Sequence, residues 1–598
     1  MGSCDDKGAM TGTAHPVGAG FLWEPVGSRE VMTPERFSEE QRQIAQAGRE
    51  FSEKEIHPRV AQIDAKGAGG LIADLLRKAG ELGLLMVDVP AEYGGLGLDT
   101  TTSMLLAEQF SHVGSFSVSL GAHTGIGTMP IVFFGTPEQK QRYLPDLSTG
   151  KMLGAYALTE PQSGSDALGA RTRAVRSPDG GHFVLNGTKQ FITNAGFADL
   201  FTVFAKVDGE QFTAFLVERR SAGVGIGPEE RKMGIRGSST CPVTLEDCRV
   251  PAGNVLGEIG RGHRIAFNIL NLGRIKLGVA TVGASKYALA ISTAYAKGRE
   301  QFGKPIASFG LIAAKLAEMA VWTFVGETMG YRTTGMLDER LRTTTTDAEK
   351  VDAVEEFSIE SSIIKVHGSE ILNRCADEAV QIHGGYGFVE DYEAERLLRD
   401  SRINRIFEGT NEINRLIVPG TLLKRAITGR NPLLEHSQTV RDRLRRADLP
   451  TVPDEPLGVE MQVVEFGKWI ALYVLAIAAE TYTMSLADEQ EILGDIADMV
   501  GRVYALDSAV QRVRQIMASG DERRTRIARD ILTAFAPRAY GFVVHTGRHL
   551  LMDMCDGPDL SEHLTMVNTL RMDWPSKVIA AKRRIAQAVL EADGYPLP

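Results

Sequence analysis

A block of strand-like sequence between residues 154 and 255 divides a chain whose remaining pattern is helical. Within this block, His182–Leu185 and Thr188–Thr193 have strand character and flank Asn186-Gly187. An Asn-Gly dipeptide between two such runs is a strong short-range sign of a hairpin, because both turn positions adopt positive φ. We therefore predict a hairpin that turns at Asn186-Gly187.

The same block contains a second predicted hairpin. Phe201–Val207 leads through Asp208-Gly209 into Phe212–Val217, again with a turn dipeptide between two apolar runs. Val243–Val250 is predicted as one more strand. Together these runs indicate a compact β domain that is inserted into a helical protein.

Helical periodicity covers the chain on both sides of the β block. Glu39–Ile63 has apolar residues at helical spacing and is broken at Gly67–Gly70. Arg274–Lys297, Phe309–Leu337 and Val351–Val380 each fit a long amphipathic helix. Long helices of this kind are typical of a helix bundle.

The 598 residues are too many for one hydrophobic core, so we expect several domains. Prolines gather between residues 431 and 458, which favours a linker there, and the helical pattern after it breaks near Gly520 and Asp556-Gly557-Pro558. The predicted boundaries are 1–33 for a disordered or extended arm, 34–153 for an N-terminal helical domain, 154–266 for the β domain, 267–430 for a helix bundle, 431–458 for a linker and 459–598 for an additional helical domain.

Charge and cysteine content argue against several function classes. The net charge of -10 argues against a general nucleic-acid binder, and the five cysteines form no C-x-x-C pair that would indicate a metal site or a redox dithiol. Met1–Met10 lacks the apolar run of an export signal, and Trp469–Ala479, the most apolar run, is too short to span a bilayer. We therefore expect a cytoplasmic protein with no metal and no nucleic-acid partner.

Five short segments carry most of the functional information, although each alone has an ordinary interpretation as a loop, a surface cation or a turn. They are Tyr156–Ser165, Phe191–Asn194, Gly298–Lys304, Gln381–Gly387 and Arg405–Ile413. Their residues and their order closely resemble the acyl-CoA dehydrogenase family.

The resemblance covers about Phe37 to Leu423. It is strongest to the very-long-chain branch, because Asn268–Arg274 is similar to that branch's version and a long helical tail follows Gly429. The resemblance implies an N-terminal helical domain, a middle β-barrel, a C-terminal four-helix bundle and an additional C-terminal helical domain. FAD would lie between barrel and bundle.

The activity implied is FAD-dependent α,β-dehydrogenation of long-chain or very-long-chain fatty acyl-CoA to trans-2-enoyl-CoA, as in fatty acid β-oxidation. Electrons would pass to an electron-transfer flavoprotein, and the protein would work as a homodimer. The resemblance implies that the adenosine and pyrophosphate of the partner subunit's FAD are held by Arg299, Phe302, Gln381 and Gly385. The resemblance implies FAD contacts from Tyr156, Leu158, Thr159, Ser165, Phe191, Ile192, Thr193, Arg299, Phe302, Gln381, Gly385, Thr410, Asn411 and Glu412.

The reaction requires one strong base, because the α-carbon of a thioester is a very weak acid. Glu408 matches the family's catalytic glutamate in Arg405–Thr410. Some relatives place the base just before the arginine matched here by Arg274, but that position is Gly273, which carries no side chain. We therefore expect Glu408 to be the base, with its own backbone N–H contacting the thioester carbonyl.

Substrate contacts are also implied by the resemblance. Small residues in Leu120–Gly127 stand where shorter-chain relatives have bulk, which favours long acyl chains, although small residues also let helices pack closely. The predicted substrate residues are Ser165, Asn271, Arg274, Phe407, Gly409, Gly121 and Ala122.

Three alternatives stay open from the sequence. An acyl-CoA oxidase has a similar C-terminal extension but returns electrons to oxygen. A flavin-containing DNA-binding relative would need a basic face, for which Arg512, Arg514, Arg523, Arg524 and Arg526 are candidates. Finally, the Asn431–Pro450 segment combines leucines with arginines and would suit peripheral membrane contact as a basic amphipathic helix.

Overall fold

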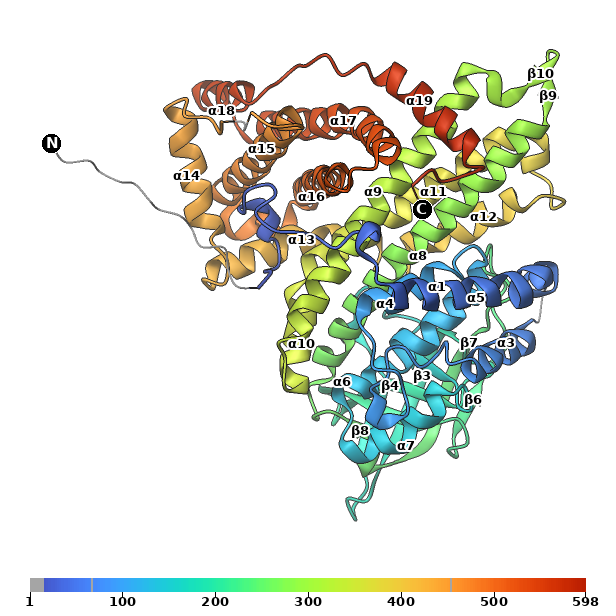
Figure 1. Ribbon diagram of the computed structural model, residues 1–598. Helices are drawn as coiled ribbons and strands as arrows, with labels where there is room; N and C mark the ends of the chain where they lie inside the picture. Colours follow the sequence, from blue (N-terminus) through green and yellow to red (C-terminus); the bar gives the residue numbers. More distant parts are fainter. Residues whose placement is uncertain (1–14, 66–67, 452–453, 598) are drawn as a thin grey trace.

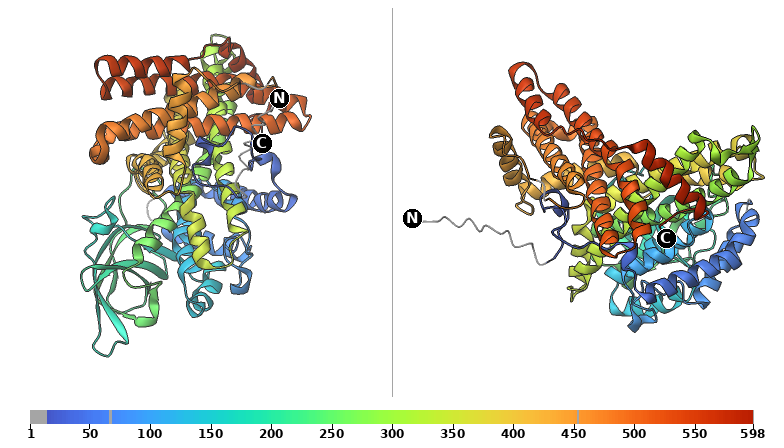
Figure 2. Two further views of the ribbon diagram at one scale, coloured as in Figure 1. Left: turned by 90° about the vertical axis from the view of Figure 1, so that its left-hand side faces the viewer. Right: turned by 45° about the horizontal axis from the view of Figure 1, so that its top comes forward.

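The computed structural model describes residues 15–65, 68–451 and 454–597. The β domain lies at one end of the molecule and the C-terminal helices at the other, with long helices between them (Figures 1 and 2). This arrangement is the predicted multidomain α plus β fold.

The N-terminal helices begin at a well-formed cap. The side chain of Ser38 accepts the backbone N–H of Gln41, whose side chain accepts the N–H of Ser38, which fixes the start of the first helix. The following helices pack around Phe51, Phe110 and Phe116. The elements are α1 Glu39–Phe51, α2 Val60–Asp64, α3 Gly69–Glu81, α4 Thr100–Glu108, α5 Gly114–Gly121, the π-helical turn η6 Ala122–Gly127, α6 Met129–Phe134 and α7 Pro137–Ser148.

The middle domain is one eight-stranded sheet that curves around its own apolar core. Hydrogen-bonded neighbours follow the order β6-β7-β3-β2-β4-β5-β8, and β1 pairs with β4. The strands are β1 Gly154–Ala157, β2 Arg173–Arg176, β3 His182–Thr193, β4 Leu200–Val207, β5 Gln211–Glu218, β6 Val224–Ile226, β7 Thr240–Pro251 and β8 Val255–Leu256.

One of the two predicted hairpins is confirmed and the other is wrong. β4 and β5 turn at Asp208-Gly209, whose φ angles are 53° and 82°. Asn186-Gly187 instead lies inside the continuous strand β3, where pairing with β7 on one side and β2 on the other keeps the backbone extended. The Asn186 side chain bonds to Asp247 across the sheet rather than closing a turn.

The bundle is built on α8 and α11, which pack side by side over much of their length. α8 begins twelve residues before the predicted start at Arg274, because Ile265, Ile269 and Leu272 continue its buried face. The predicted helix from Val351 is divided at Phe357. The elements are α8 Gly262–Gly298, the hairpin strands β9 Glu300–Gln301 and β10 Lys304–Pro305, α9 Gly310–Leu341, α10 Asp347–Glu356, α11 Ser358–His383, α12 Glu393–Ser401 and α13 Asn411–Ile427.

The C-terminal helices share one continuous core with the bundle. The predicted breaks near Gly520 and Gly557 are confirmed, and a further break follows Tyr482. The helices are α14 Leu433–Arg445, α15 Gly458–Tyr482, α16 Gln490–Ala518, α17 Glu522–Met554, α18 Gly557–Thr569 and α19 Val578–Glu591.

The predicted linker at 431–458 is wrong over much of its length, because α14 is a packed helix. Leu433, Val440 and Leu444 are buried and form one face of α14 against α15. The apolar face that a membrane-bound helix would use is therefore turned into the protein. Among the residues that the structure describes, two helical segments, Gly262–Gly298 and Gly458–Asp488, are long and apolar enough to cross a membrane, but core helices of soluble proteins satisfy the same test.

The predicted N-terminal arm is also corrected where the structure describes it. Phe21 and Leu22 are buried, and the N–H groups of Ala19 and Val26 donate to Glu360 and Glu465. This segment therefore straps the bundle to the C-terminal helices. Residues 1–14 of the predicted arm lie outside the described residues.

Candidate active site

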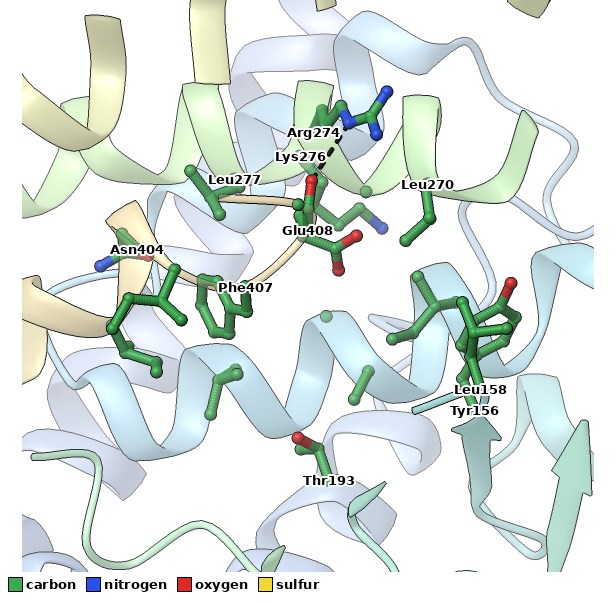
Figure 3. A pocket seen from close by; sticks show the side chains of 18 of the residues that line it. Tyr156, Leu158, Thr193, Leu270, Arg274, Lys276, Leu277, Asn404, Phe407 and Glu408 are labelled. Atoms are coloured by element: carbon green, nitrogen blue, oxygen red, sulfur yellow. Dashed lines mark hydrogen bonds between the residues drawn. The ribbon is translucent and has the colours of Figure 1, made fainter. Parts of the chain in front are cut away.

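A cavity of about 1590 Å³ lies where the N-terminal helices, the β domain and the bundle meet. Tyr156, Leu158 and Thr193 from the β domain surround the same space as Glu408 and Phe407 from the loop before α13 (Figure 3). The cavity brings together most of the predicted site residues: Tyr156, Leu158, Thr159, Ser165, Phe191, Ile192, Thr193, Gly121, Ala122, Asn271, Arg274, Phe407, Glu408, Gly409 and Thr410.

Glu408 stands on a strained turn. Its φ of 57° is rare for a residue with a side chain, and Gly409 follows at 79°. Burial raises the pKa of the Glu408 carboxyl to about 7, although the positive charges of Arg274 and Lys365 act in the opposite direction. Its Oε2 atom is buried and has no hydrogen-bond partner within the described structure. A desolvated carboxylate without a partner is suited to accept a proton near neutral pH.

Arg274 fixes the backbone beneath this carboxylate. Its Nε donates to the Glu408 carbonyl at 3.1 Å (Figure 3). One of its terminal nitrogens donates to Asn271 Oδ1 at 2.8 Å. Arg274 is itself buried, which lowers its pKa to about 10, so the guanidinium stays charged at neutral pH. The predicted pair Asn271 and Arg274 is thus brought to the base.

The opposite wall is supported by a buried ion pair in the β domain. Lys189 Nζ donates to Glu160 Oε1 at 2.7 Å and to the Leu158 carbonyl at 3.2 Å. Burial disfavours the Glu160 carboxylate, but Lys189 and hydrogen bonds from Arg171 and Thr172 outweigh it and lower its pKa to about 2. The pair therefore fixes the loop that begins at Leu158.

The walls of the cavity fit a flavin. Phe191 has a φ of 58° and an exposed ring, and it lines the cavity beside Thr193. The Thr193 hydroxyl has no side-chain hydrogen bond in the described parts of the chain. Apolar and aromatic walls with a few inward polar groups are typical of a cofactor site.

Six predicted FAD residues lie outside this cavity. Arg299, Phe302, Gln381 and Gly385 are exposed at or just after the C-terminal ends of α8 and α11, where the Arg299 guanidinium lies over the ring of Tyr386. The other two follow the base: Asn411 is buried inside the bundle, where its Oδ1 accepts from Lys365, and Glu412 is exposed on the first turn of α13.

Two residues that hold the turn of Glu408, the predicted base, were missed from the sequence. Lys365, in the apolar run from Ile363 to Val366 on α11, donates from Nζ to the Gly409 carbonyl at 2.6 Å. Asn414 donates to the carbonyls of Gly409 and Thr410 at 2.9 and 3.0 Å. A lysine inside an apolar helical run was the one available signal, because such a charge needs a buried partner.

Beyond the base, the cavity continues along α8. Gly273, Leu277, Ala280, Thr281 and Ala284 line it at helical spacing, so the cavity follows one face of the helix. The eleven steps from Gly273 to Ala284 advance roughly 16 Å along the helix axis. Leu106, Ala107 and Val118 line the cavity from α4 and α5.

The arginines proposed as a DNA-binding face are engaged elsewhere. Arg512 is fully buried and donates to Glu35 and Glu327, and Arg524 also pairs with Glu35. Two of the five candidate cations are therefore neutralised at the contact between α16, α17 and the N-terminal segment. Arg514 and Arg526 also lie within 4 Å of Glu455 and Glu522, so four of the five candidate cations have an acidic partner, which weakens the case for a basic face that a duplex would need.

Comparisons with known proteins agree along the chain. Models of the acyl-CoA dehydrogenase N-terminal, middle and C-terminal domains match residues 38–151, 155–248 and 260–423, and a further acyl-CoA dehydrogenase C-terminal domain model matches 467–569. The chain is 48% identical over 590 residues to a probable acyl-CoA dehydrogenase of Bacillus subtilis, covering 97% of this chain and 98% of that protein.

Two further relatives extend the comparison. The human mitochondrial very long-chain specific acyl-CoA dehydrogenase is 44% identical over 348 residues, which cover 56% of this chain and 51% of that protein. The crystal structure of an acyl-CoA dehydrogenase complexed with FAD from Bacillus anthracis matches with a TM-score of 0.94 and 48% identity, covering 97% of this chain and 100% of that chain.

Proposed function

This chain belongs to the acyl-CoA dehydrogenase family and is an FAD-dependent acyl-CoA dehydrogenase, and we propose that it oxidises long-chain or very-long-chain fatty acyl-CoA to trans-2-enoyl-CoA with Glu408 as the base. One observation carries the assignment of the base. The Glu408 carboxylate is buried beside the cavity, its pKa is raised to about 7, and one of its oxygens has no partner in the described structure.

Five residues that line the cavity have a defined part in this proposal. Glu408 takes the proton from the α-carbon, and its own backbone N–H faces the thioester carbonyl. Bound FAD supplies the hydride acceptor for the β-carbon. Tyr156, Thr193 and Phe191 would hold the flavin, since they line the wall across from the base. Arg274 keeps Glu408 in place through its carbonyl.

The length of the cavity supports a long acyl chain. An extended alkyl chain advances roughly 1.26 Å for each carbon–carbon bond, so roughly 16 Å of α8 accommodates about thirteen bonds of an acyl chain. A Cβ placed on Gly121 would meet no atom within 4 Å, so this position leaves the tunnel open. Each buried methylene contributes about 0.8 kcal/mol, which favours long chains in such a tunnel.

Anaerobic bleaching of the flavin by saturated acyl-CoAs of increasing length tests reaction and chain length together. We expect strong bleaching with long chains, and none with Glu408→Gln, which should still hold FAD and acyl-CoA. Glu435→Gln on α14 is the matched control, because this glutamate is exposed and does not line the cavity. Bleaching by Glu408→Gln at the native rate would refute the assignment of the base.

We also propose a homodimer in which Arg299, Phe302, Gln381 and Gly385 hold the partner subunit's FAD. These residues lie outside their own cavity, and Phe302 is 93% exposed on the β9–β10 hairpin with a φ of 52°. An arginine fork suits a pyrophosphate. Light scattering should show a dimer, and Arg299→Ala should remain dimeric but release FAD. A monomer that keeps FAD would contradict this proposal.

We propose an electron-transfer flavoprotein as the electron acceptor. The proposal rests on membership of the family rather than on a surface of this chain. Turnover should then need an added electron-transfer flavoprotein or an artificial acceptor. Stoichiometric hydrogen peroxide without such an acceptor would instead show an oxidase.

A further inference from the structure

The turn that carries Glu408 is held by three side-chain donors that bond its successive carbonyls. Arg274 Nε donates to the Glu408 carbonyl at 3.1 Å, and Lys365 Nζ donates to the Gly409 carbonyl at 2.6 Å. Asn414 Nδ2 donates to the Thr410 carbonyl at 3.0 Å. Because Glu408 has an unfavourable positive φ, its conformation depends on such external contacts.

Lys365 is the donor whose charge lies in the most apolar part of a helix. It lies on α11 between Ile364 and Val366, and its side chain is fully buried. Its second acceptor is Asn411 Oδ1 at 2.8 Å, and Asn411 in turn donates to Ser369. Among the residues that the structure describes, no carboxylate lies within 4 Å of Lys365 Nζ.

A buried ammonium without a carboxylate in contact is costly, and a methionine would fill the same space without that cost. Burial lowers the pKa of Lys365, and the negative charge of an ionised Glu408 opposes this shift more strongly than any other group does, so the ammonium is favoured when the carboxylate is ionised. Conversely, Lys365 lowers the pKa of Glu408. The charge of Lys365 is therefore coupled to the proposed base.

We propose that Lys365 is a positioning residue for the dehydrogenation, which clamps the Glu408–Thr410 turn and places a positive charge behind the base. This inference rests on the proposed role of Glu408. Lys365 does not line the cavity, so it acts through the turn and through its charge and not by touching the substrate.

The other titratable groups that face Glu408 or Lys365 come from α8, α11, α13 and β1. Arg274 on α8 acts in the same direction as Lys365 on Glu408. Glu370 on α11 and Glu412 on α13 support the charge of Lys365, whereas Arg274 opposes it. Tyr156 on β1 faces Glu408, and its pKa is raised by burial and then by that carboxylate, so it stays neutral.

Three variants separate the clamp from the charge. Lys365→Met removes both, Lys365→Gln keeps one N–H donor without the charge, and Lys365→Arg keeps the charge. The pH profiles of kcat and kcat/KM, measured on FAD-loaded enzyme with a long-chain acyl-CoA, report the ionisation of the base. Lys468→Met is the matched control, because Lys468 is also fully buried but bonds Glu24 and Glu465, and none of the three lines the cavity.

We expect Lys365→Met to lower kcat by roughly 100-fold, because a small displacement of a reacting group is costly. The acid limb of its pH profile, along which activity rises as the base ionises, should move up by about one pH unit, since a positive charge near the carboxylate is lost. Lys365→Gln should show the same shift of the limb with a smaller loss of kcat. Lys365→Arg should return the limb towards the native position, and Lys468→Met should leave it unmoved.

The inference is overturned if Lys365→Gln, holding FAD, shows the native limb and the native kcat, or if Lys468→Met moves the limb as far as Lys365→Met does. Lys365→Gln also provides the test if Lys365→Met does not fold. Failure of the proposed function gives a different result, because Glu408→Gln would then turn over. An inactive Glu408→Gln together with a native Lys365→Gln rejects the positioning role alone.

Discussion

The carboxylate of Glu408 lies against the backbone of Gly273. A Cβ built on Gly273 would be 2.7 Å from Glu408 Oε2 and 3.0 Å from Oε1, closer than non-bonded atoms approach. The missing side chain at position 273 is therefore what lets the carboxylate occupy this place. The two residues come from α8 and from the turn before α13, 135 positions apart in the chain.

Gly273→Ala should consequently displace the base without blocking the cavity. The added methyl group must push the Glu408 carboxylate away, and a shift of about 1 Å in a reacting group can cost roughly 100-fold in rate. We expect kcat to fall by that order while FAD content stays native. Stopped-flow measurement of flavin reduction is the check, and an unchanged rate would show that the carboxylate has room to spare.

Activity should rise with pH through about 7. Because burial raises the pKa of the Glu408 carboxyl, this group is protonated below about pH 7 and cannot accept a proton, whereas above about pH 7 it is ionised and the enzyme is active. The raised pKa also makes the free energy of unfolding depend on pH, because the folded protein favours the protonated carboxyl. The stability that Glu408 contributes is present at low pH and is lost as the pH rises through about 7. Glu408→Gln should thus gain melting temperature relative to the native protein at pH 8 but not at pH 5.

Gly121→Leu should shorten the range of accepted chains. The position has no atom within 4 Å of a new Cβ and lines the cavity, so a leucine side chain would project into the tunnel. Excluding three or four methylenes at about 0.8 kcal/mol each lowers kcat/KM for long chains by roughly 100-fold. Short-chain acyl-CoAs should be little affected. Gly494→Leu on α16, which is equally open but outside the cavity, is the control.

Arg512→Met should loosen the C-terminal helices from the bundle. Arg512 is fully buried and bonds Glu327 at 2.6 Å and Glu35 at 3.0 Å, and Tyr595 donates to Glu327 at 2.8 Å. Removing one partner of a buried pair costs about 3–5 kcal/mol. Denaturant unfolding should show this loss. Arg526→Met, which breaks an exposed pair with Glu522, should change stability by less than about 1 kcal/mol.

Local patterns predicted the class and order of the elements but not their tertiary partners. Asp208-Gly209 forms the turn expected of it, because β4 and β5 pair with each other directly on either side of it. Asn186-Gly187 does not, because long-range pairing of β3 with β7 stabilises an extended backbone that a local rule does not include. The buried face of α14 was also missed from the sequence, because its few apolar residues stand among prolines and arginines.

The sequence by itself determined the family, the order of the helical and β domains, and Glu408 as the candidate base, since motif residues and periodicity are local properties of the chain. The tertiary structure alone decided where that base lies and what holds it. Gly273 leaves space for the carboxylate, and Lys365 and Asn414 bond the turn that carries it. Burial, strain and the pKa of a group depend on neighbours that are distant in the chain, so packing decides them.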